Sequence, residues 1–345
     1  MTLKLTLTLG LTLLAVPALA AGTGKPPASS YDLVLLQSDQ AGVAQNQDPD
    51  LVNAWGLSLR TGATDLWVSD NGTGLSTVYN FNTGSKEFGV TIPGGVPTGT
   101  VGQDTLDGFT ITENGRSGSA YFMFDSESGL ITGWNPSVDG ANAVVAVDNS
   151  ANHSVYKGLA LDQVDKLLYA ADFHNNEVQI YDTSFALVKK FTDPNLPRRF
   201  APFNVAFLNG QLYVAFAKRA KGSDDEVDKL GLGYVDIFNK NGKFVKQLIA
   251  NGPLDAPWGM TIAPSGFGSF AGDLLVGNFG NGWINVFDPS SGAPLGTLSN
   301  KRGRPLKIDG LWGLLSGPGA KVTFAAGPND ESHGLLGQIE VHGAN

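Results

Sequence analysis

Cysteine is absent from the 345-residue sequence. Its absence excludes disulfide bonds, thiolate nucleophiles, thiolate metal sites and iron–sulfur clusters. Exported domains depend on disulfides most when their cores are small, whereas a chain of this length can bury enough apolar surface without them. The missing cysteines are therefore compatible with an exported protein.

Positive charge and long helical patterns are also scarce. The 23 Lys and Arg residues are outnumbered by 32 Asp and Glu residues, the net charge is −9, and no long basic run occurs. No nucleic acid partner is expected, because binding one needs a cationic surface. The lack of long helical periodicity argues against α/β folds. The 45 glycines and 18 prolines are typical of short strands joined by tight turns.

The first 20 residues have the pattern of a secretory signal peptide. Lys4 supplies the positive start, residues 5–16 are mostly apolar, and Ala18 and Ala20 are small residues of the kind that signal peptidase requires. We expect cleavage after Ala20, a flexible lead-in over residues 21–30 and a secreted or periplasmic protein. The alternative is a retained anchor, although its apolar span over residues 5–21 is at the lower limit for crossing a bilayer. No later segment is predicted to span a membrane.

A six-fold repeat is the most informative pattern in the chain. A glycine that follows a bulky or charged residue and precedes an apolar one recurs at steps of 52, 50, 46, 55 and 54 residues, with one degenerate copy. The six copies are Trp55-Gly56-Leu57, Asp107-Gly108-Phe109, Lys157-Gly158-Leu159, Phe203-Asn204-Val205, Trp258-Gly259-Met260 and Trp312-Gly313-Leu314. Each copy leads into short β-rich runs separated by polar turns. Such a period predicts a β-propeller.

The two ends of the chain indicate how the ring closes. The sixth unit has three strands before the sequence ends at Asn345, and the strand predicted over residues 31–37 belongs to no unit. Pairing these two segments would remove two exposed sheet edges. We therefore predict an all-β fold, with one six-bladed propeller domain over residues 31–345. Its blades have four strands, the N-terminal strand closes the last blade, and the protein is expected to be a monomer.

Several segments resemble a known group of proteins. Ala54-Trp55-Gly56-Leu57, Gly222–Val227 and Gly327–Gly334 are similar to segments of exported bacterial six-bladed propellers that have no assigned activity. The repeat units also resemble NHL repeats and, more distantly, the calcium-dependent lactonase and arylesterase superfamily. The resemblance covers roughly residues 31–345 and implies the propeller fold. Some members of the bacterial family end in a PEP-CTERM sorting tail, which this sequence lacks.

The residues that precede the repeat glycine form one candidate ligand site. In a propeller they lie near the mouth of the central channel, and here they are Trp55, Asp107, Lys157, Phe203, Trp258 and Trp312. Aromatic walls with a few converging polar groups are typical of small-molecule and sugar pockets. The alternative is that the aromatic side chains plug the channel, as buried rings often do.

Two enlarged loops on the same face form a second candidate. One covers residues 218–229 and contains Asp225, and the other covers residues 328–333 and contains Glu331 and His333. Long loops on one face of a rigid scaffold often carry function, although charged loops can simply be solvated. The carboxylates could bind Ca²⁺, and His333 beside Glu331 could act as an acid–base group.

Three hypotheses of function follow from these patterns. The first is a secreted propeller that binds a small-molecule, glycan or protein ligand on its loop face without chemistry. The second, implied by the lactonase resemblance, is a calcium-dependent hydrolase with Asn53, Asp107 and Asn204 as possible ligands of Ca²⁺. The third is an extracellular scaffold that recognises a protein or polysaccharide through residues 218–229. Fold alone does not choose among them.

Cleavage after Ala20 is directly testable. A full-length chain expressed in a bacterium with a Sec pathway should yield a secreted or periplasmic product whose N-terminal residue is Ala21. Intact-mass measurement and N-terminal sequencing report the cleavage site. A product that keeps Lys4 and sediments with membranes would support the retained anchor instead.

Overall fold

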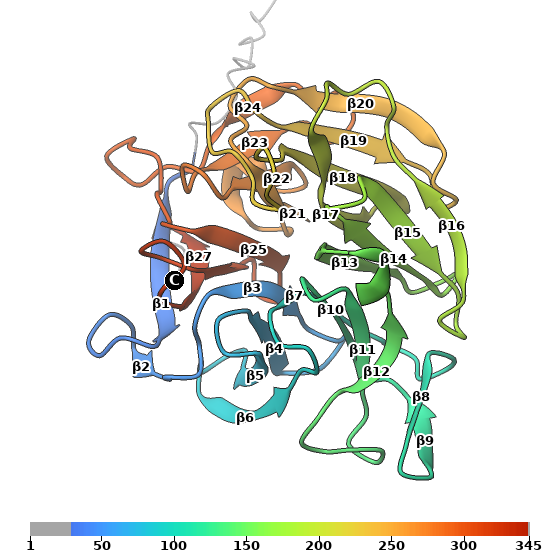
Figure 1. Ribbon diagram of the computed structural model, residues 1–345. Coiled ribbons are helices and arrows are strands. Elements are labelled where there is room, and N and C mark those ends of the chain that lie inside the picture. The colour runs from blue at the N-terminus through green and yellow to red at the C-terminus, as the bar shows by residue number, and fades with distance from the viewer. Residues whose placement is uncertain (1–28, 344–345) are drawn as a thin grey trace, which may run out of the picture.

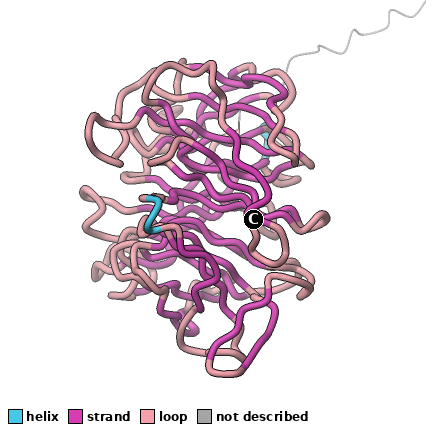
Figure 2. Tube along the Cα trace, turned by 45° about the vertical axis from the view of Figure 1, so that its right-hand side comes forward, coloured by secondary structure: helices cyan, strands magenta, loops and turns pink. Residues whose placement is uncertain are grey.

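The computed structural model describes residues 29–343, so the predicted signal peptide and most of the lead-in lie outside the described residues. The strands form six small sheets arranged around a central axis, which confirms the predicted six-bladed propeller (Figure 1). Within these residues helix is limited to two 3-10 turns, Ser150–Asn152 and Gly268–Phe270, and nearly all regular structure is strand (Figure 2). Within residues 29–343 no helix is long and apolar enough to cross a membrane.

The first three blades follow one another along the chain. Blade 1 consists of β3 (Ala54–Ser58), β4 (Asp65–Asp70), β5 (Leu75–Asn80) and β6 (Lys86–Thr91). Blade 2 consists of β7 (Pro97–Gly102), β10 (Phe122–Ser126), β11 (Leu130–Trp134) and β12 (Val144–Asp148). Blade 3 consists of β13 (Tyr156–Asp162), β14 (Leu167–Asp172), β15 (Glu177–Tyr181) and β16 (Leu187–Phe191).

The other three blades complete the ring. Blade 4 consists of β17 (Phe200–Leu208), β18 (Gln211–Lys218), β19 (Tyr234–Phe238) and β20 (Phe244–Ala250). Blade 5 consists of β21 (Pro257–Ile262), β22 (Leu274–Asn278), β23 (Ile284–Phe287) and β24 (Pro294–Thr297). Blade 6 consists of β25 (Leu311–Ser316), β26 (Val322–Ala326), β27 (Leu335–Val341) and β1 (Tyr31–Ser38).

Blade 6 closes as the sequence predicted. The N-terminal strand β1 pairs antiparallel with β27, from Tyr31 opposite Val341 to Ser38 opposite Leu335. In Figure 1 the blue β1 lies beside the red β27. The sequence did not indicate the fifth strand, β2 (Asn46–Gln47), which adds parallel to the outer edge of β1. Together these pairings cover the edge that three strands alone would leave exposed.

The second repeat was assigned to the wrong glycine. Asp107-Gly108-Phe109 matches the sequence pattern, but the inner strand of blade 2 is β7, which contains Gly99. The cause is an insertion between the first two strands of this blade: the hairpin β8 (Thr110–Glu113) and β9 (Arg116–Ser119). Gly108 lies in the chain that leads into this hairpin, so the apparent spacing was coincidental.

Close approach of neighbouring inner strands explains the repeat glycine. A Cβ atom at Gly56 would lie 2.5 Å from the Thr98 carbonyl oxygen and 2.7 Å from the Thr100 nitrogen of the next blade. At Gly259 it would lie 2.5 Å from the Trp312 carbonyl oxygen, and at Gly313 it would meet the Trp55 carbonyl oxygen, which closes the ring. Only glycine leaves room for these backbones to meet.

The core lies between the blades. Within the described residues, buried apolar side chains form six clusters, one at each junction between neighbouring blades, and a seventh on the axis. Alternation along each strand sends side chains to both faces of a blade, so every sheet packs on both sides. The blades therefore hold the loops at their ends in fixed positions around the axis.

The ring contact predicts a large effect from one methyl group. Gly56→Ala should lower the free energy of unfolding by about 1–3 kcal/mol or more, because the new Cβ meets backbone that cannot rotate away. Thermal unfolding of Gly56→Ala and of a control, Gly89→Ala, measures this. In the control, the new Cβ would have no neighbour closer than 3.8 Å. Equal melting temperatures for the two variants would contradict the explanation.

Candidate functional site

Aromatic side chains close the central channel. Trp55, Trp258 and Trp312 come from the inner strands of blades 1, 5 and 6, and each is at most 4% exposed. The rings of Trp55 and Trp312 stack with centroids 3.5 Å apart, and Trp258 stands edge-on to both, at 5.9 and 5.7 Å. Phe203, from blade 4, packs on Trp312 at 5.7 Å and is fully buried. Of the two alternatives for these residues, the arrangement is that of a plug.

Hydrogen bonds fix two of the indoles. Trp258 Nε1 donates to the Lys157 carbonyl oxygen at 2.7 Å, and Trp312 Nε1 donates to Asn53 Oδ1 at 3.1 Å. The first bond joins blades 5 and 3 across the axis. Trp55 Nε1 has no partner among the described residues. We call Trp55, Phe203, Trp258 and Trp312 the aromatic plug.

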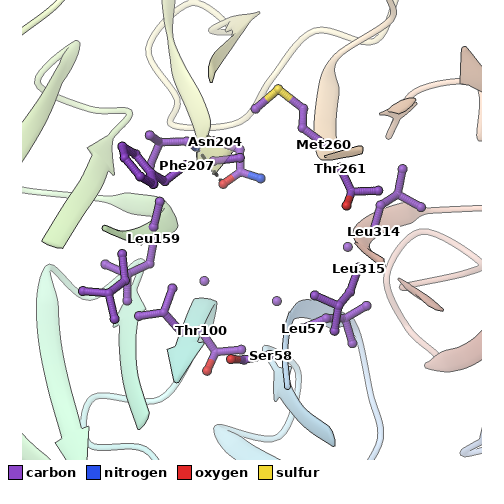
Figure 3. Close-up of a pocket in the computed structure, with 18 of the residues that line it drawn as sticks. Leu57, Ser58, Thr100, Leu159, Asn204, Phe207, Met260, Thr261, Leu314 and Leu315 are labelled. Carbon is purple, nitrogen blue, oxygen red and sulfur yellow. Dashed lines mark hydrogen bonds between the residues drawn. The ribbon is translucent and has the colours of Figure 1, made fainter. Parts of the chain in front are cut away.

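A cavity lies on one side of the plug. It encloses about 240 Å³ and is lined by the inner strands downstream of the repeat glycines. Figure 3 shows Leu57, Leu159, Met260 and Leu314 around the central space, with the hydroxyl groups of Ser58 and Thr100 among them. Its walls combine apolar side chains with polar groups and carry no charged side chain.

A buried lysine lies on the other side of the plug. Lys157 is 3% exposed, and its Nζ atom lies 2.6 Å from Glu127 Oε1 and 5.1 Å from the centre of the Trp55 ring. Burial works against its charge, but Glu127, Glu226 and Glu331 more than offset burial and raise the pKa of Lys157. The side chain is therefore an ammonium ion held between carboxylates and an indole face.

A chain of hydrogen bonds continues from this ion pair around the axis. Asn71 Nδ2 donates to Glu127 Oε2 at 3.0 Å. Asn53 Nδ2 donates to Asn71 Oδ1 at 3.2 Å and to Glu331 Oε1 at 3.0 Å. The five linked residues, Lys157, Glu127, Asn71, Asn53 and Glu331, come from blades 3, 2, 1 and 6 or the turns that belong to them.

Two further carboxyl groups approach from blade 4. Burial raises the pKa of Glu226 to about 7, although Lys157 opposes the shift, and it raises the pKa of Asp228 to about 6, with Asp255 and Glu331 adding to it. Burial also raises the pKa of Glu331. Lys157, Glu127, Asn71, Asn53, Glu226, Asp228 and Glu331 together are called the charged mouth. Clustered groups with shifted pKa values are a feature of functional sites.

Asp107 is not part of the mouth, so its expected position there is wrong. Its side chain is 70% exposed, and its Oδ1 atom lies 2.8 Å from Lys166 Nζ in the turn between β13 and β14. Thr98 occupies the equivalent position in blade 2, and its hydroxyl group donates to Asp125 Oδ1 at 2.9 Å. The inserted hairpin is again the reason, because it carries Asp107 away from the inner strand.

The two loop residues Asp225 and His333 lie outside the hydrogen-bond chain. The Asp225 side chain is exposed and accepts a hydrogen bond from the Ser223 hydroxyl group, although its charge helps to raise the pKa of Glu331. His333 Nδ1 lies 2.7 Å from Asp39 Oδ2 in the segment between β1 and β2. Ligand roles for these two residues stay predictions.

The residues carried over from the lactonases do not come together. Asn53 Nδ2 donates to Glu331 Oε1 in the hydrogen-bond chain, and Asn204 Nδ2 donates to the Trp258 carbonyl oxygen at 2.8 Å. Asp107 pairs with Lys166, away from both. Within residues 29–343 no group of three or more His, Cys, Asp or Glu side chains has the arrangement of a metal site.

Sequence reasoning missed Glu127, Asn71, Glu226 and Asp228. Glu127 and Asn71 lie in turns between the second and third strands, the class of loop expected on this face. Those turns are short, so loop length gives no signal there. Glu226 and Asp228 lie in the enlarged loop over residues 218–229, one and three positions after Asp225.

The fold and the plug define a six-bladed β-propeller with a charged mouth on its loop face. No family model matches the chain. Three proteins of Acanthamoeba polyphaga mimivirus are similar to it. Uncharacterized protein L690 is 31% identical over 90% of this chain and 86% of its own length, and uncharacterized protein R648 is 30% identical over 90% and 80%. Uncharacterized protein R640 is 31% identical over 78% of this chain and 52% of its own length.

The extent of these matches shows the family. This chain belongs to the same family as the mimivirus proteins L690 and R648. The names of all three mimivirus proteins assign no activity.

The raised pKa of Glu226 predicts how stability depends on pH. Between the ordinary glutamate pKa of 4.5 and about 7, the folded protein holds a proton that the unfolded chain has released. Folding is therefore favoured as pH falls through this window and disfavoured as pH rises. The melting temperature should increase from pH 8 to pH 5.5, with Asp236, whose pKa burial raises to about 8, adding to the trend.

Glu226→Gln should reduce that increase, because the amide does not titrate. Glu113→Gln, in the hairpin of blade 2, is the matched control and should keep the wild-type slope. Thermal unfolding at both pH values measures the difference. Identical slopes in Glu226→Gln and wild type would show that Glu226 does not carry the shifted pKa.

Proposed function

We propose that the protein binds a small organic cation in the charged mouth. The observation that carries this proposal is the charge balance: one ammonium, already paired with Glu127, faces two more carboxyl groups, Glu226 and Glu331, over a closed floor. Asp228, which is exposed, lies near Glu226 and Glu331 and adds a third carboxyl group to the mouth. A propeller fold fits a binding role, since its loops present side chains around one rigid mouth.

Burial makes the excess carboxyl groups receptive to a cation. Desolvation is the main cause of the raised pKa values of Glu226, Asp228 and Glu331, and neighbouring carboxylates add to all three shifts. A ligand that brings positive charge among them would favour the ionised form of each group. Its binding would be stabilised by the same low-dielectric surroundings that now oppose ionisation.

The direction of the hydrogen bonds supports the same class of ligand. Asn53 and Asn71 use their NH₂ groups on Glu331, Asn71 and Glu127, so these donors are already engaged. The Glu226 carboxyl group has a hydrogen bond from its own backbone, which leaves acceptor capacity for a ligand. The mouth therefore presents acceptors, and an amine or guanidinium supplies matching donors.

The predicted export indicates where the protein would meet its ligand. If the first 20 residues direct secretion, the mouth would face the medium or the periplasm, where it could bind small cations.

Calorimetric titration with agmatine tests the proposal, with glucose as a neutral probe rich in hydroxyl groups. Agmatine should bind to wild type and release protons at pH 7, because its charge lowers the pKa of Glu226. Glu226→Gln/Glu331→Gln should weaken binding at least tenfold. Glu87→Gln/Glu113→Gln removes the same number of carboxylates from an exposed and a half-buried position outside the charged mouth and should leave binding unchanged.

Other outcomes would replace the proposal. Glucose binding without agmatine binding would favour a glycan ligand. Calcium binding that chelation reverses, and that Glu226→Gln/Glu331→Gln abolishes, would favour the hydrolase hypothesis and an ester and lactone screen. A protein partner whose capture depends on residues 218–229 would favour the scaffold.

A further inference from the structure

A second cavity lies between blades 3 and 4, and its charge is positive, opposite to that of the carboxyl groups in the charged mouth. It encloses about 320 Å³ and is lined by Asn176, Arg198, Arg199, Phe200, Ala201 and Arg219. Asn176 lies in the turn after β14, the two neighbouring arginines come directly before β17, and Arg219 comes directly after β18 (Figure 1). The folded chain thus brings three arginines from two separate segments to one hollow.

This concentration of arginine is unusual for the chain. The sequence contains seven arginines, and the other four are Arg60, Arg116, Arg302 and Arg304. Three of seven therefore line a single cavity in a protein whose net charge is −9. Like charges repel when they are brought together, so such a cluster is stable only with a counter-charge or good solvation.

The counter-charge is incomplete within the described residues. No carboxylate there forms an ion pair with Arg198 or Arg199. The nearest carboxylate of Arg219 is that of Asp224, at 3.7 Å, and Asp224 Oδ1 lies closer to His174 Nδ1, at 2.8 Å. Arg198 and Arg199 are both exposed, so solvent balances their charge and a ligand can reach their guanidinium groups.

Hydrogen bonds to the backbone fix the Arg219 side chain and join Arg219 to Arg199. Arg219 Nη1 donates to the carbonyl oxygens of Phe173 and His174, which ties its guanidinium to the end of β14. The Arg219 nitrogen donates to the Arg199 carbonyl oxygen at 2.6 Å, which joins the two segments. Arg199 has a φ angle of 73°, a conformation that is strained for a residue other than glycine. Such strain often occurs at functional sites.

We propose that this cavity, which we call the arginine pocket, binds the tetrahedral oxyanion of a phosphate or sulfate ester. Planar guanidinium groups donate paired hydrogen bonds to such oxyanions, which single lysine ammonium groups cannot do. The volume exceeds what a single inorganic anion needs, and Phe200 offers an apolar wall for the organic part of an ester. This site is separate from the charged mouth and uses none of its residues.

Titration at constant ionic strength tests the arginine pocket. The probes are inorganic phosphate, inorganic sulfate, glucose 6-phosphate and glucose 6-sulfate, with glucose as the uncharged reference. At least one ester should bind to wild type, and more tightly than the corresponding inorganic anion. The phosphate and sulfate arms distinguish the two sources of the oxyanion.

Variants identify the groups responsible. Arg198→Ala/Arg199→Ala should weaken ester binding at least tenfold, and Arg198→Lys/Arg199→Lys should lie between that variant and wild type, because charge remains but paired donation is lost. Arg302→Ala/Arg304→Ala removes the same charge from an exposed turn and should bind like wild type. Circular dichroism and melting temperature confirm that each variant is folded.

Three results would overturn the proposal. The first is a wild-type protein that binds none of the charged probes. The second is unchanged affinity in Arg198→Ala/Arg199→Ala. The third is an equal loss in Arg302→Ala/Arg304→Ala, which would indicate general surface electrostatics. Agmatine binding serves as the reference in every variant, so a failure of the arginine pocket and a failure of the charged mouth can be told apart.

Discussion

The contact between neighbouring inner strands is the constraint on which the structure depends. At Gly56 and Gly259 the backbone of the next blade lies where a side chain would begin. In blade 4 the position is taken by Asn204, whose amide group bonds the Trp258 carbonyl oxygen of the next inner strand. Six such contacts in sequence bring the strands close enough to form a closed ring. In this closed ring each blade is held by both neighbours, and the inner strand that ends each sheet is short and protected at the centre.

The plug and both candidate sites follow from that ring. The residue before each glycine turns toward the axis, and three of the six are tryptophans, so the indoles meet and fill the centre. The filled centre separates the uncharged cavity from the charged mouth. Lys157, which takes the same position in blade 3, extends over the plug because the ring centre is already occupied, and Glu127 neutralises it there.

Much of the fold could be predicted from the sequence, because the repeat glycines are backbone requirements and leave a regular trace. Blade number and closure by the N-terminal strand were confirmed, and β1 covers the strand predicted over residues 31–37. Blade 2 was the exception: Thr98-Gly99-Thr100 lacks the bulky residue before its glycine, and a chance match at Gly108 was stronger. Periodicity alone cannot detect an inserted hairpin such as β8–β9.

The site was less predictable, because it depends on side chains that meet only across blades. Lys157 and Glu331 were identified from repeat position and loop length. Nothing local marks Glu127 as the partner of Lys157, since 30 residues separate them and their contact requires blades 2 and 3 to pack. The arginine pocket was missed for the same reason: Arg219 and Arg199 are neighbours only through the pairing of β17 with β18.

The charged mouth and the arginine pocket carry opposite charges, and the cavity on the far side of the plug has no charged lining. A crystal structure of the protein grown with agmatine tests this arrangement most directly. Agmatine should lie above the plug, with its guanidinium or amine against the carboxylates of Glu226 and Glu331. Agmatine in the uncharged cavity beside Leu57 and Leu314, or an empty mouth at a saturating concentration, would contradict the proposed cation site.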